Sequence, residues 1–593
     1  MCGILGFNWN DEKLGRKLGQ LIKHRGPDGE GYYSDERVTL GHRRLSIIDL
    51  SERGKQPMSN EDGTVWITYN GEVFNFKELR SELLEKGHKF ASDTDTEVIV
   101  HGYEEYGVKI LDKLNGQFAF CIYDTKKKEL FLARDRIGIN PLYYYHDKTH
   151  FVFCSELKVI MKSGVPKEID EFALNYYLMF GYTPRDQSIL KNAFKLEPGH
   201  YIIFDLKKSS ISECRKYWQI KPKNSITDEM TAISSIRKQL DRSVKRRLVA
   251  DVPVGAFLSG GLDSSLVVAL MSKYTRNLNT FSIRFDHEDF DESVYAEKIS
   301  RLFKTKHNVI RFTGKDVEEL MKSLAYHYDE PFGDPSMIPT FLVSKVARQH
   351  VTVSLSGDGG DELFGGYVSY KHYRMLKVQD HYPSILNKAA LRLYGNEKVK
   401  AFLEAGTLKK RHRFAYLMSN LELEDAWLLA GDPEKYLEKY SRSFLQGPAV
   451  NEATHIDLHN YISENIMTKV DRACLANSLE SRPPLLDHEM IELACKMHPK
   501  LKLRKGEGKY ILKKAFEDVL PHDVIYRKKQ GFGVPLKHYF RDELKGLVDK
   551  YTRNNKKIIK LRSKLSDKGR DHSRIIWRIM MLNMWMERWQ NES

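Results

Sequence analysis

The feature that most constrains the fold is a glycine-rich turn between a hydrophobic strand and a hydrophobic helix. The run VGAFL, residues 254–258, precedes the turn SGGLDSS, residues 259–265, and the apolar run LVVALMSKY follows it. A strand, a tight turn and a helix in this order are typical of a parallel β-α-β unit. The later runs TFSIRF and VTVSL resemble further strands, so we expect a parallel sheet with helices on both faces.

The turn itself has the chemistry of a phosphate site. Backbone N–H groups are free where a helix begins, and the helix dipole attracts an anion to that position. Gly260 and Gly261 allow the backbone to approach such an anion closely, which favours phosphate binding over an ordinary strand-to-helix turn. The Walker pattern of the P-loop proteins does not occur in the sequence.

A second acidic loop, SGDGGDE at residues 356–362, follows the strand-like run VTVSL. If its strand lies beside the strand that precedes the turn, the carboxyl ends of both meet and the two loops face each other. Mg²⁺ is a hard cation that bridges carboxylates and phosphates. The sequence therefore predicts Mg²⁺-assisted nucleotide chemistry, with Asp263 and Asp361 as the metal ligands.

The N-terminus indicates a different chemistry. Cys2 directly follows Met1, and we expect removal of Met1 to make Cys2 the first residue. Its α-amine, with an ordinary pKa of about 7.7–8.0, could then accept the thiol proton and activate the nucleophile. The alternative is a small buried hydrophobe, which is how we interpret the other five cysteines. They are scattered without a C-x-x-C pair, and indicate neither a zinc site nor a disulfide framework.

The two chemistries lie in differently patterned parts of the chain. Up to about Leu206 the sequence is β-rich, with helices predicted from Phe76 to Gly87 and from near Asp95, which favours an α+β layer fold. From about Tyr367 helical spacing dominates. Short strands are predicted around residues 65–69, 118–123, 130–133 and 143–145, and a last helix around Ile575, Ile579, Leu582 and Trp585.

Seven motifs carry a resemblance to a known family. MCGILGF, HRGPDGEGYY, GHRRLSIIDLS, YNGEVFNF and SDTDTEV occur in that order within the first 98 residues and resemble the class II glutamine amidotransferases. SGGLDSS, followed by SGDGGDE, resembles the PP-loop region of the ATP pyrophosphatases. This order is similar to that of the glutamine-hydrolysing asparagine synthetases over nearly the whole chain. The resemblance implies an α+β N-terminal nucleophile (αββα) glutaminase domain at residues 1–207, a linker at 208–228, and an α/β PP-loop ATP pyrophosphatase domain with a helical C-terminal part at 229–593.

The first set of motifs would supply what glutamine needs, namely a cation, an anion and oxyanion donors. By resemblance, Arg44 binds the carboxylate, Glu72 and Asp95 contact the ammonium, and the Asn70 side chain with the Gly71 N–H forms the oxyanion hole. Taken singly, Arg44 also suits a surface ion pair, and Asn70-Gly71 a hairpin turn. Beside Cys2, the implied glutamine-binding residues are Arg44, Leu45, Ser46, Ile47, Ile48, Asn70, Gly71, Glu72 and Asp95.

The second set implies ATP as a substrate. Lys509, in GKYILKK, is a candidate cation for the developing phosphate charge, and Asp358 is expected to assist adenylate formation. Some family members carry glutamate at the position of Asp358, which leaves the reach of this shorter side chain open. The implied ATP-binding residues are Leu258, Ser259, Gly260, Gly261, Asp263, Ser264, Ser265, Ile283, Ser356 and Gly357.

The reaction that the resemblance implies is synthesis of asparagine from aspartate, glutamine and ATP through a β-aspartyl-AMP intermediate. We expect the stretch at residues 329–345 to help form the acceptor pocket, and a water-poor passage with apolar walls to carry ammonia between the sites. A carboxylate of a cell-wall or polysaccharide precursor as acceptor is a second hypothesis that uses the same motifs.

The net charge of +15 adds a hypothesis of another class, a PP-loop enzyme that modifies tRNA. The charge is spread along the chain, so we expect no nucleic-acid partner. A basic scaffolding protein would leave the ordered motifs unexplained. Neither a membrane-length apolar run nor a signal-peptide pattern occurs, and we expect a cytoplasmic protein without a membrane partner. A homodimer is a further expectation from the family.

Overall fold

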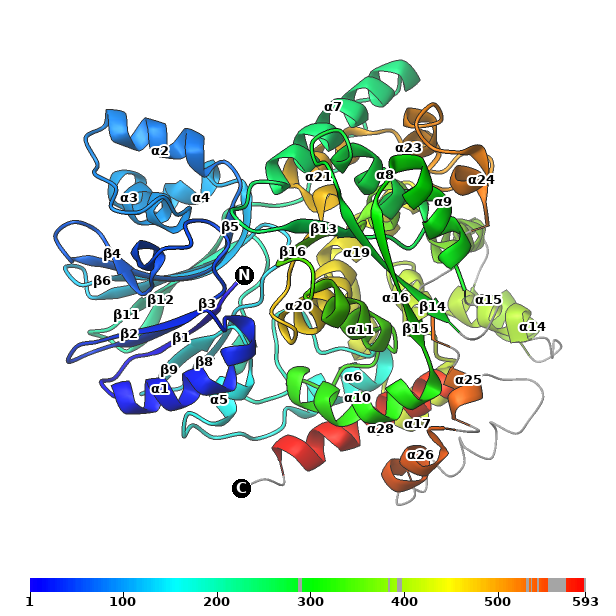
Figure 1. The fold of residues 1–593 in the computed structure, drawn as a ribbon. Helices are drawn as coiled ribbons and strands as arrows, with labels where there is room; N and C mark the ends of the chain where they lie inside the picture. Colours follow the sequence, from blue (N-terminus) through cyan, green and yellow to red (C-terminus); the bar gives the residue numbers. More distant parts are fainter. Residues whose placement is uncertain are drawn as a thin grey trace.

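The N-terminal part of the chain forms two stacked antiparallel sheets of six strands each (Figure 1). The first sheet has the order β10-β8-β9-β1-β3-β2, and the second has the order β12-β11-β7-β6-β5-β4. The strands are β1 (Gly3–Phe7), β2 (Gly29–Ser34), β3 (Thr39–Arg44), β4 (Met58–Ser59), β5 (Val65–Val73), β6 (Gly116–Asp124), β7 (Glu129–Arg134), β8 (Tyr143–His146), β9 (Phe151–Cys154), β10 (Ala193–Lys195), β11 (His200–Asp205) and β12 (Ser210–Lys216).

Four layers result, because helices cover the outer face of each sheet. The inner faces of both sheets share one apolar core, in which Ile4 and Leu40 meet Cys121 and Leu132. The predicted αββα architecture is confirmed. The helices are α1 (Glu12–Leu21) and α5 (Lys158–Met161) on the first sheet, α2 (Phe76–Glu85), α3 (Thr96–Tyr106) and α4 (Ile110–Lys113) on the second, and α6 (Glu171–Phe180), which leads toward the second domain.

Two sequence-based interpretations need correction in this domain. Residues 208–228 were expected to be a linker, but they contain β12, which pairs with β11 through contacts such as His200 with Lys216. The first domain therefore continues to the end of β12, because the hairpin completes the edge of the sheet. The hairpin-turn interpretation of Asn70-Gly71 is also excluded, since both residues lie within β5 and pair with Ala119 and Phe118 of β6.

The second domain is built on a parallel sheet of five strands with the order β15-β14-β13-β16-β17. Chain connections leave the central strand β13 toward opposite sides, so the carboxyl ends of β13 and β16 form a topological switch point. Such points are where open α/β sheets bind ligands. The strands are β13 (Val254–Phe257), β14 (Asn279–Phe285), β15 (Lys306–Phe312), β16 (Val353–Leu355) and β17 (Glu480–Arg482).

Helices cover both faces of this sheet, as expected for a parallel sheet. One group packs around the helix that follows the glycine-rich turn, and a second group packs on the opposite face. The first group is α7 (Glu229–Arg247), α8 (Leu262–Met271) and α9 (Ser293–Phe303), and the second is α10 (Gly314–His327), α11 (Met337–Ala347) and α20 (Thr468–Leu475).

The rest of the second domain is mainly helical, as its periodicity predicted. The structure describes residues 1–285, 291–381, 384–391, 397–528, 533–534, 536–540, 543–552 and 572–590. The remaining helices are α12 (Gly360–Phe364), α13 (Val368–Leu376), α14 (Ser384–Ala390), α15 (Glu397–Thr407), α16 (His412–Ser419), α17 (Leu423–Ala430), α18 (Glu434–Tyr440), α19 (Ala449–His459), α21 (His488–Lys496), α22 (Pro499–Lys502), α23 (Tyr510–Ala515), α24 (His522–Tyr526), α25 (Leu536–Tyr539), α26 (Lys545–Thr552) and α28 (Ser573–Trp589).

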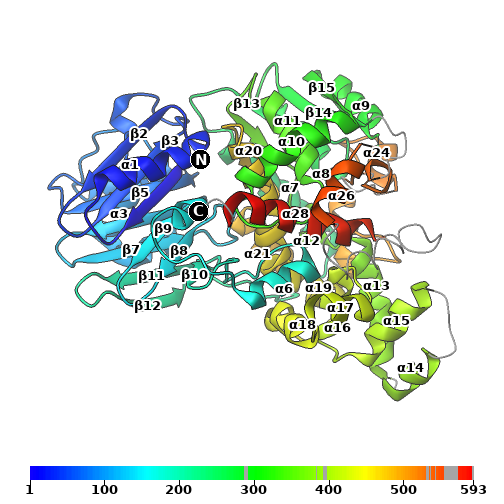
Figure 2. The same cartoon turned by 90° about the horizontal axis from the view of Figure 1, so that it is seen from below.

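The last helix joins the two domains. Figure 2 shows α28 lying beside α6 and α10 on the side of the molecule where the domains meet. Its Trp585 and Trp589 are buried in the apolar cluster that α1 forms on the first sheet, with Leu18 among the neighbours. The Trp585 indole N–H donates to the carbonyl of Asp329 at 2.8 Å. Core packing therefore extends across the domain interface.

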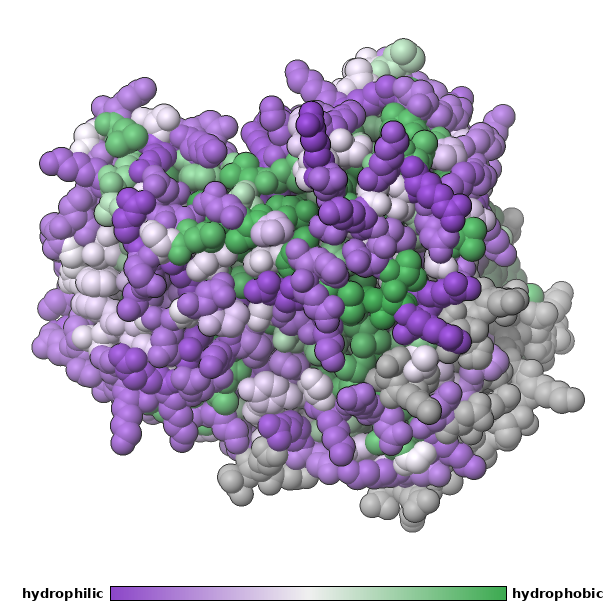
Figure 3. All heavy atoms as spheres, in the orientation of Figure 1, coloured by the Kyte–Doolittle hydropathy of each residue, from purple (hydrophilic) through white to green (hydrophobic). Residues whose placement is uncertain are grey.

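The surface is dominated by polar residues. Figure 3 shows hydrophilic side chains over most of one face, with hydrophobic residues gathered in a band toward its middle. Among the residues that the structure describes, no helix is both long enough and apolar enough to cross a membrane.

Candidate active sites

Cys2 lies buried at the start of β1, next to the strand that carries Asn70. The backbone N–H of Cys2 donates to Asn70 Oδ1 at 2.7 Å, and its Sγ lies 3.8 Å from the carbonyl oxygen of Leu45. Burial raises the pKa of the Cys2 thiol, while the nearby N-terminal ammonium opposes the rise. The thiol is therefore held protonated in this form, and deprotonating it requires a base close by.

Asn70 and Gly71, the expected oxyanion hole, lie next to each other on β5. The Asn70 side chain is fully buried, and its Nδ2 has no hydrogen-bond partner among the described residues. Gly71 lies flat against β6, where an added Cβ would be 2.4 Å from the Gln117 carbonyl oxygen. An unpaired buried amide donor beside a nucleophile can stabilise negative charge that develops on a substrate oxygen.

Arg44 ends β3 and faces a cavity of about 390 Å³. Its Nη1 donates to the Ser51 carbonyl at 2.6 Å and its Nη2 to the Asp49 carbonyl, which holds the guanidinium in place without neutralising it. The surface ion-pair interpretation is thus not what the structure shows, because carbonyl groups are its partners. The cavity is lined by Asp28, Gly29, Glu30, His42, Arg44, Ser46, Leu50, Glu52, Lys55, Gln56, Val252, Arg348 and Thr352.

The side chains of the residues that follow Arg44 point in two directions, toward the cavity and into the core. Ser46 lines the cavity, and its N–H donates to Asp28 Oδ2 at 2.9 Å. Leu45 and Ile47 are buried in the large core between the domains, with Ile48 packed against it. The carbonyl of Ile47 accepts from the backbone N–H of Asp251 in the second domain at 2.8 Å. Only part of the predicted glutamine-binding run therefore faces the cavity through its side chains.

The two acids expected to contact the glutamine ammonium have protein partners. Asp95 Oδ2 accepts from the Tyr69 hydroxyl at 2.7 Å and from the Val73 N–H at 2.8 Å, so it clamps β5 on both sides of Asn70. Glu72 pairs with Arg482 of the second domain at 3.0 Å. Burial raises the pKa of Glu72, and the Asp95 charge raises it further.

Sequence reasoning missed the second-domain residues that complete this site. Glu480 and Arg482 lie on β17, and both are fully buried. Glu480 forms an ion pair with the Met1 ammonium, and Arg482 Nε donates to Glu480 Oε1 at 2.6 Å. No local pattern in the sequence indicates these contacts, because they form only when the edge of one sheet meets the N-terminus of another domain.

The glycine-rich turn joins β13 to α8 in the second domain. Gly260 has a φ of +71°, and an added Cβ would lie 2.5 Å from the backbone nitrogen of Ala296. The hydroxyls of Ser259 and Ser264 are 3.0 Å apart, and Ser264 Oγ donates to the Gly261 carbonyl at 3.2 Å. Ser265 is buried at the start of the helix. The turn is thus rigidly formed and presents the N-terminal end of α8.

The acidic loop after β16 packs directly on this turn, as the sequence predicted. An added Cβ on Gly357 would be 2.6 Å from the Ser264 nitrogen, and one on Gly360 would be 2.3 Å from Asp263 Oδ1. Lys509 joins the loops, since its Nζ lies 2.5 Å from Asp263 Oδ2 and 2.7 Å from Asp361 Oδ1. Burial lowers the pKa of Lys509, but the two carboxylates raise it above its ordinary value, so the lysine is a cation.

The other residues expected around ATP lie near the same strand ends. Leu258 directly follows β13, and its N–H donates to the Phe281 carbonyl at 2.8 Å, while Ile283 lies on β14. The Ser356 N–H donates to the Arg482 carbonyl at 3.1 Å. Burial raises the pKa of Asp358, and the positive charge of Lys469 opposes it.

Residues 329–345, for which the acceptor pocket stays a prediction, begin in the domain interface. Asp329 pairs with Arg472 at 3.1 Å, and Glu330 Oε2 accepts from the Tyr143 hydroxyl at 2.9 Å. Asp334 is nearer the ATP residues, because it pairs at 3.5 Å with the same Lys469 that affects Asp358.

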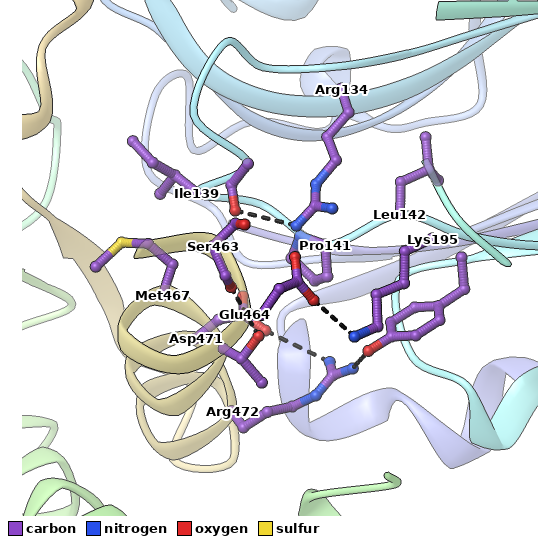
Figure 4. Close-up of a pocket in the computed structure, with 13 residues that line it drawn as sticks. Arg134, Ile139, Pro141, Leu142, Lys195, Ser463, Glu464, Met467, Asp471 and Arg472 are labelled. Carbon is purple, nitrogen blue, oxygen red and sulfur yellow. Dashed lines mark hydrogen bonds and ion pairs between the residues drawn. The ribbon is translucent and has the colours of Figure 1, made fainter. Parts of the chain in front are cut away.

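The interface next to these residues contains a small cavity of about 10 Å³, with room for about one water molecule (Figure 4). Its walls contain both charged side chains and apolar ones, among them Ile139 and Met467. Lys195 pairs with Glu464 at 2.6 Å, and Arg472 Nη2 is 3.4 Å from the Tyr143 hydroxyl. The apolar walls expected for an ammonia passage stay a prediction, since this cavity has walls of both kinds.

Comparison with known proteins supports the division into two sites. The family model described as glutamine amidotransferase domain matches residues 1–218, and the model described as asparagine synthase matches residues 235–587. Asparagine synthetase (glutamine-hydrolyzing) 1 of Bacillus subtilis is 34% identical, with 99% of this chain and 96% of the relative covered.

Two further relatives show the range of the similarity. A putative glutamine-hydrolyzing asparagine synthetase 2 of Methanocaldococcus jannaschii is 39% identical, with 80% of this chain and 98% of the relative covered. The amidase chyE of Penicillium rubens is 25% identical, with 88% and 84% covered. The family matches, the paired sites and the full-length similarity agree, and this chain belongs to the glutamine-hydrolysing asparagine synthetase family.

Proposed function

We propose that this protein synthesises asparagine from aspartate, glutamine and ATP, releasing glutamate, AMP and pyrophosphate. The observation that carries the proposal is the convergence of Asp263, Asp361 and Lys509 at the switch point of the second sheet, in a chain that also carries Cys2 beside Asn70. One site is suited to polyphosphate chemistry, and the other to attack on a carboxamide.

The glutaminase site is active only after Met1 has been removed. The freed α-amine of Cys2 accepts the thiol proton, and the thiolate attacks the side-chain carbonyl of glutamine. Asn70 Nδ2 and the Gly71 N–H stabilise the oxyanion, while Arg44 binds the substrate carboxylate at the cavity. Collapse of the intermediate releases ammonia and leaves a glutamyl thioester, which water hydrolyses to glutamate. Glu72 and Asp95, beside their partners Arg482 and Tyr69, supply the carboxyl groups that contact the glutamine ammonium.

The second reaction activates aspartate. Its side-chain carboxylate attacks the α-phosphorus of ATP, pyrophosphate leaves, and a mixed anhydride with AMP forms. Backbone N–H groups of residues 259–265 hold the phosphates, and Leu258 and Ile283 border the adenine and ribose. Lys509 balances the phosphate charge, and Asp358 assists near Lys469. Ammonia then adds to the activated carbonyl, and AMP leaves.

The residues present fit a Mg²⁺ ion. Asp263 and Asp361 each direct a carboxylate oxygen toward the Nζ of Lys509. The two carboxylates therefore lie close enough together to share a cation. We propose that these two carboxylates hold the ion, which would neutralise the charge of the pyrophosphate as it leaves.

The test is acceptor dependence. Purified, nuclease-treated protein with ATP, glutamine and Mg²⁺ should release AMP and form asparagine only when aspartate is added. AMP release that needs a larger carboxylate would instead favour the second hypothesis. AMP release that needs added tRNA would overturn both.

A further inference from the structure

Four potential metal ligands converge outside the two sites described above. Glu61 lies in the turn between β4 and β5, His88 follows α2, and His101 and Glu104 lie on α3. One nitrogen or oxygen atom from each of these residues lies within 4.8 Å of each of the other three. Residues three apart on a helix share a face, which brings His101 and Glu104 together.

The spacing of the ligand atoms fits a tetrahedral ion. His101 Nδ1 lies 3.1 Å from Glu104 Oε2 and 3.5 Å from Glu61 Oε2, and His88 Nδ1 lies 3.9 Å from Glu104 Oε2. Zinc bonds to nitrogen and oxygen of about 2.0–2.1 Å place tetrahedral ligands about 3.3 Å apart. Small side-chain rotations would therefore close the set around one ion.

Groups behind the ligands fix their orientation. Glu104 Oε1 accepts from Asn60 Nδ2 at 2.6 Å, and Glu61 Oε1 accepts from the Lys89 N–H at 3.0 Å. These bonds leave Oε2 of each carboxylate directed at the imidazoles. Metal sites in proteins show this pattern of outer partners, which orient the ligating atoms.

A carboxylate also lies behind each of the two histidines. His101 Nε2 lies 3.5 Å from Glu97 Oε1, and His88 Nε2 lies 3.7 Å from Glu105 Oε2. A carboxylate behind the far nitrogen of an imidazole is common for metal-bound histidine. The His101 side chain is only 1% exposed, and its Nε2 has no hydrogen bond within the described part of the chain. Burying an imidazole with one nitrogen facing two carboxylates costs free energy unless a cation binds between them.

We propose that Glu61, His88, His101 and Glu104 bind one divalent transition-metal ion, for which Zn²⁺ has the fitting chemistry. Two imidazole nitrogens favour Zn²⁺ over Mg²⁺ or Ca²⁺, which prefer oxygen ligands alone. Two carboxylates neutralise the ion. The site is independent of the proposed function, and no step of catalysis passes through it.

The ion would tie three segments of the outer layer together. They are the β4–β5 turn, the end of α2 and the middle of α3, whose N-terminal end carries Asp95. Asp95 in turn clamps β5 on both sides of Asn70. The expected consequence is a more stable glutaminase domain rather than a new reaction.

A proton is the alternative to the ion. Burial lowers the pKa of His101, but the carboxylates of Glu97 and Glu104 beside its ring outweigh that effect and raise the pKa above its ordinary value. An imidazolium among carboxylates would also satisfy the charge. Metal binding must therefore be measured directly.

The test uses full-length protein stripped of metal with a chelator and titrated with Zn²⁺ alone. Wild-type protein should bind one Zn²⁺ at this site and show a higher Tm with it, and Co²⁺ at the same site should give the visible absorption of a tetrahedral complex. The variants His88→Ala and His101→Gln should weaken Zn²⁺ binding ~100-fold or more and lose the shift in Tm.

His150→Ala is the matched control, because His150 also lies beside a carboxylate, Asp147, but is not one of the four clustered residues. It should bind Zn²⁺ like the wild type. His88 is partly exposed, so His88→Ala decides the question even if His101→Gln fails to fold. Zn²⁺ binding that is absent from the wild type, or unchanged in His88→Ala, overturns the proposal.

Discussion

Arg482 of the second domain forms a buried ion pair with Glu72 of the first, with 3.0 Å between Nη2 and Oε2. The same side chain donates to Glu480 and to the carbonyl of Val249, and its own carbonyl accepts from the Ser356 N–H. One residue thus contacts the strand of the oxyanion hole and the loop after β16. Arg482 thus connects the two candidate sites directly.

Replacing this arginine should destabilise the protein. Arg482→Met leaves the buried Glu72 without its cation and removes one of the two cations beside Glu480, and we expect a loss of about 3–5 kcal/mol in the free energy of unfolding. Denaturant unfolding measures it. Arg504→Met is the control, since its pair with Glu229 is exposed and should contribute at most about 1 kcal/mol. Equal losses in both variants would contradict a special role for Arg482.

Cys2→Ala should separate the two reactions. Glutamine-dependent amidation should disappear because the nucleophile is gone, whereas amidation with ammonium salt should persist because the second site is intact. Both activities are measured as asparagine formation. The control Cys214→Ala removes an exposed thiol and should leave both unchanged. Loss of both activities in Cys2→Ala would show that this residue is needed for the structure instead.

Lys509→Met should have the reverse selectivity. Removing the cation between Asp263 and Asp361 should lower aspartate-dependent pyrophosphate release ~100-fold or more, while glutamine hydrolysis continues. Lys513→Met, on the helix that begins directly after Lys509, is the control, because Lys513 pairs with Glu507 at 2.8 Å. If the two variants lose pyrophosphate release equally, Lys509 has no particular role in adenylation.

Gly71→Ala should damage the glutaminase site by geometry alone. The new Cβ would be 2.4 Å from the Gln117 carbonyl oxygen and 2.7 Å from Phe118 Cα, so β5 must shift and carry the Gly71 N–H with it. We expect glutamine hydrolysis to fall ~100-fold. Gly447→Ala, whose Cβ would meet no atom within 4 Å, is the control. Wild-type hydrolysis in Gly71→Ala would exclude this N–H from the oxyanion hole.

His455 should make stability depend on pH. Burial, with help from the charge of Arg185, lowers its pKa to about 4 in the folded protein. Between the unfolded value of about 6.5 and pH 4, only the unfolded chain gains the proton, so stability falls as the pH falls. The contribution is on the order of 2–3 kcal/mol at pH 4. His455→Gln should flatten the pH dependence of unfolding over this range, and an unchanged slope would contradict the assignment.

Much of the fold could be predicted because its signals are local. The helix predicted from Phe76 to Gly87 is α2, which ends at Glu85, and the strand-turn-helix around residues 259–265 joins β13 to α8. Apolar spacing and turn residues depend on the nearby backbone, so they predict local structure without knowledge of the rest of the chain. The boundary at residue 207 failed because β12 is an exposed edge strand with a weak apolar pattern.

The catalytic sites were predictable only in part. GKYILKK offers three lysines, and the structure places Lys509 between the carboxylates, while Lys513 and Lys514 pair with glutamates elsewhere. Likewise, residues 329–345 contribute Asp329 and Glu330 to the interface with the first domain. Direction of a side chain depends on packing, which motif spacing does not encode.

The sequence by itself determined the two chemistries, because Cys2, Asn70-Gly71 and the glycine-rich turn depend on residue type and local backbone. Tertiary structure alone decided which charges meet. Arg482 and Glu72 are 410 positions apart along the chain, and Lys509 and Asp263 are 246 apart. Such pairs form where strand ends and domain surfaces come together, and burial then makes each unpaired charge too costly to tolerate.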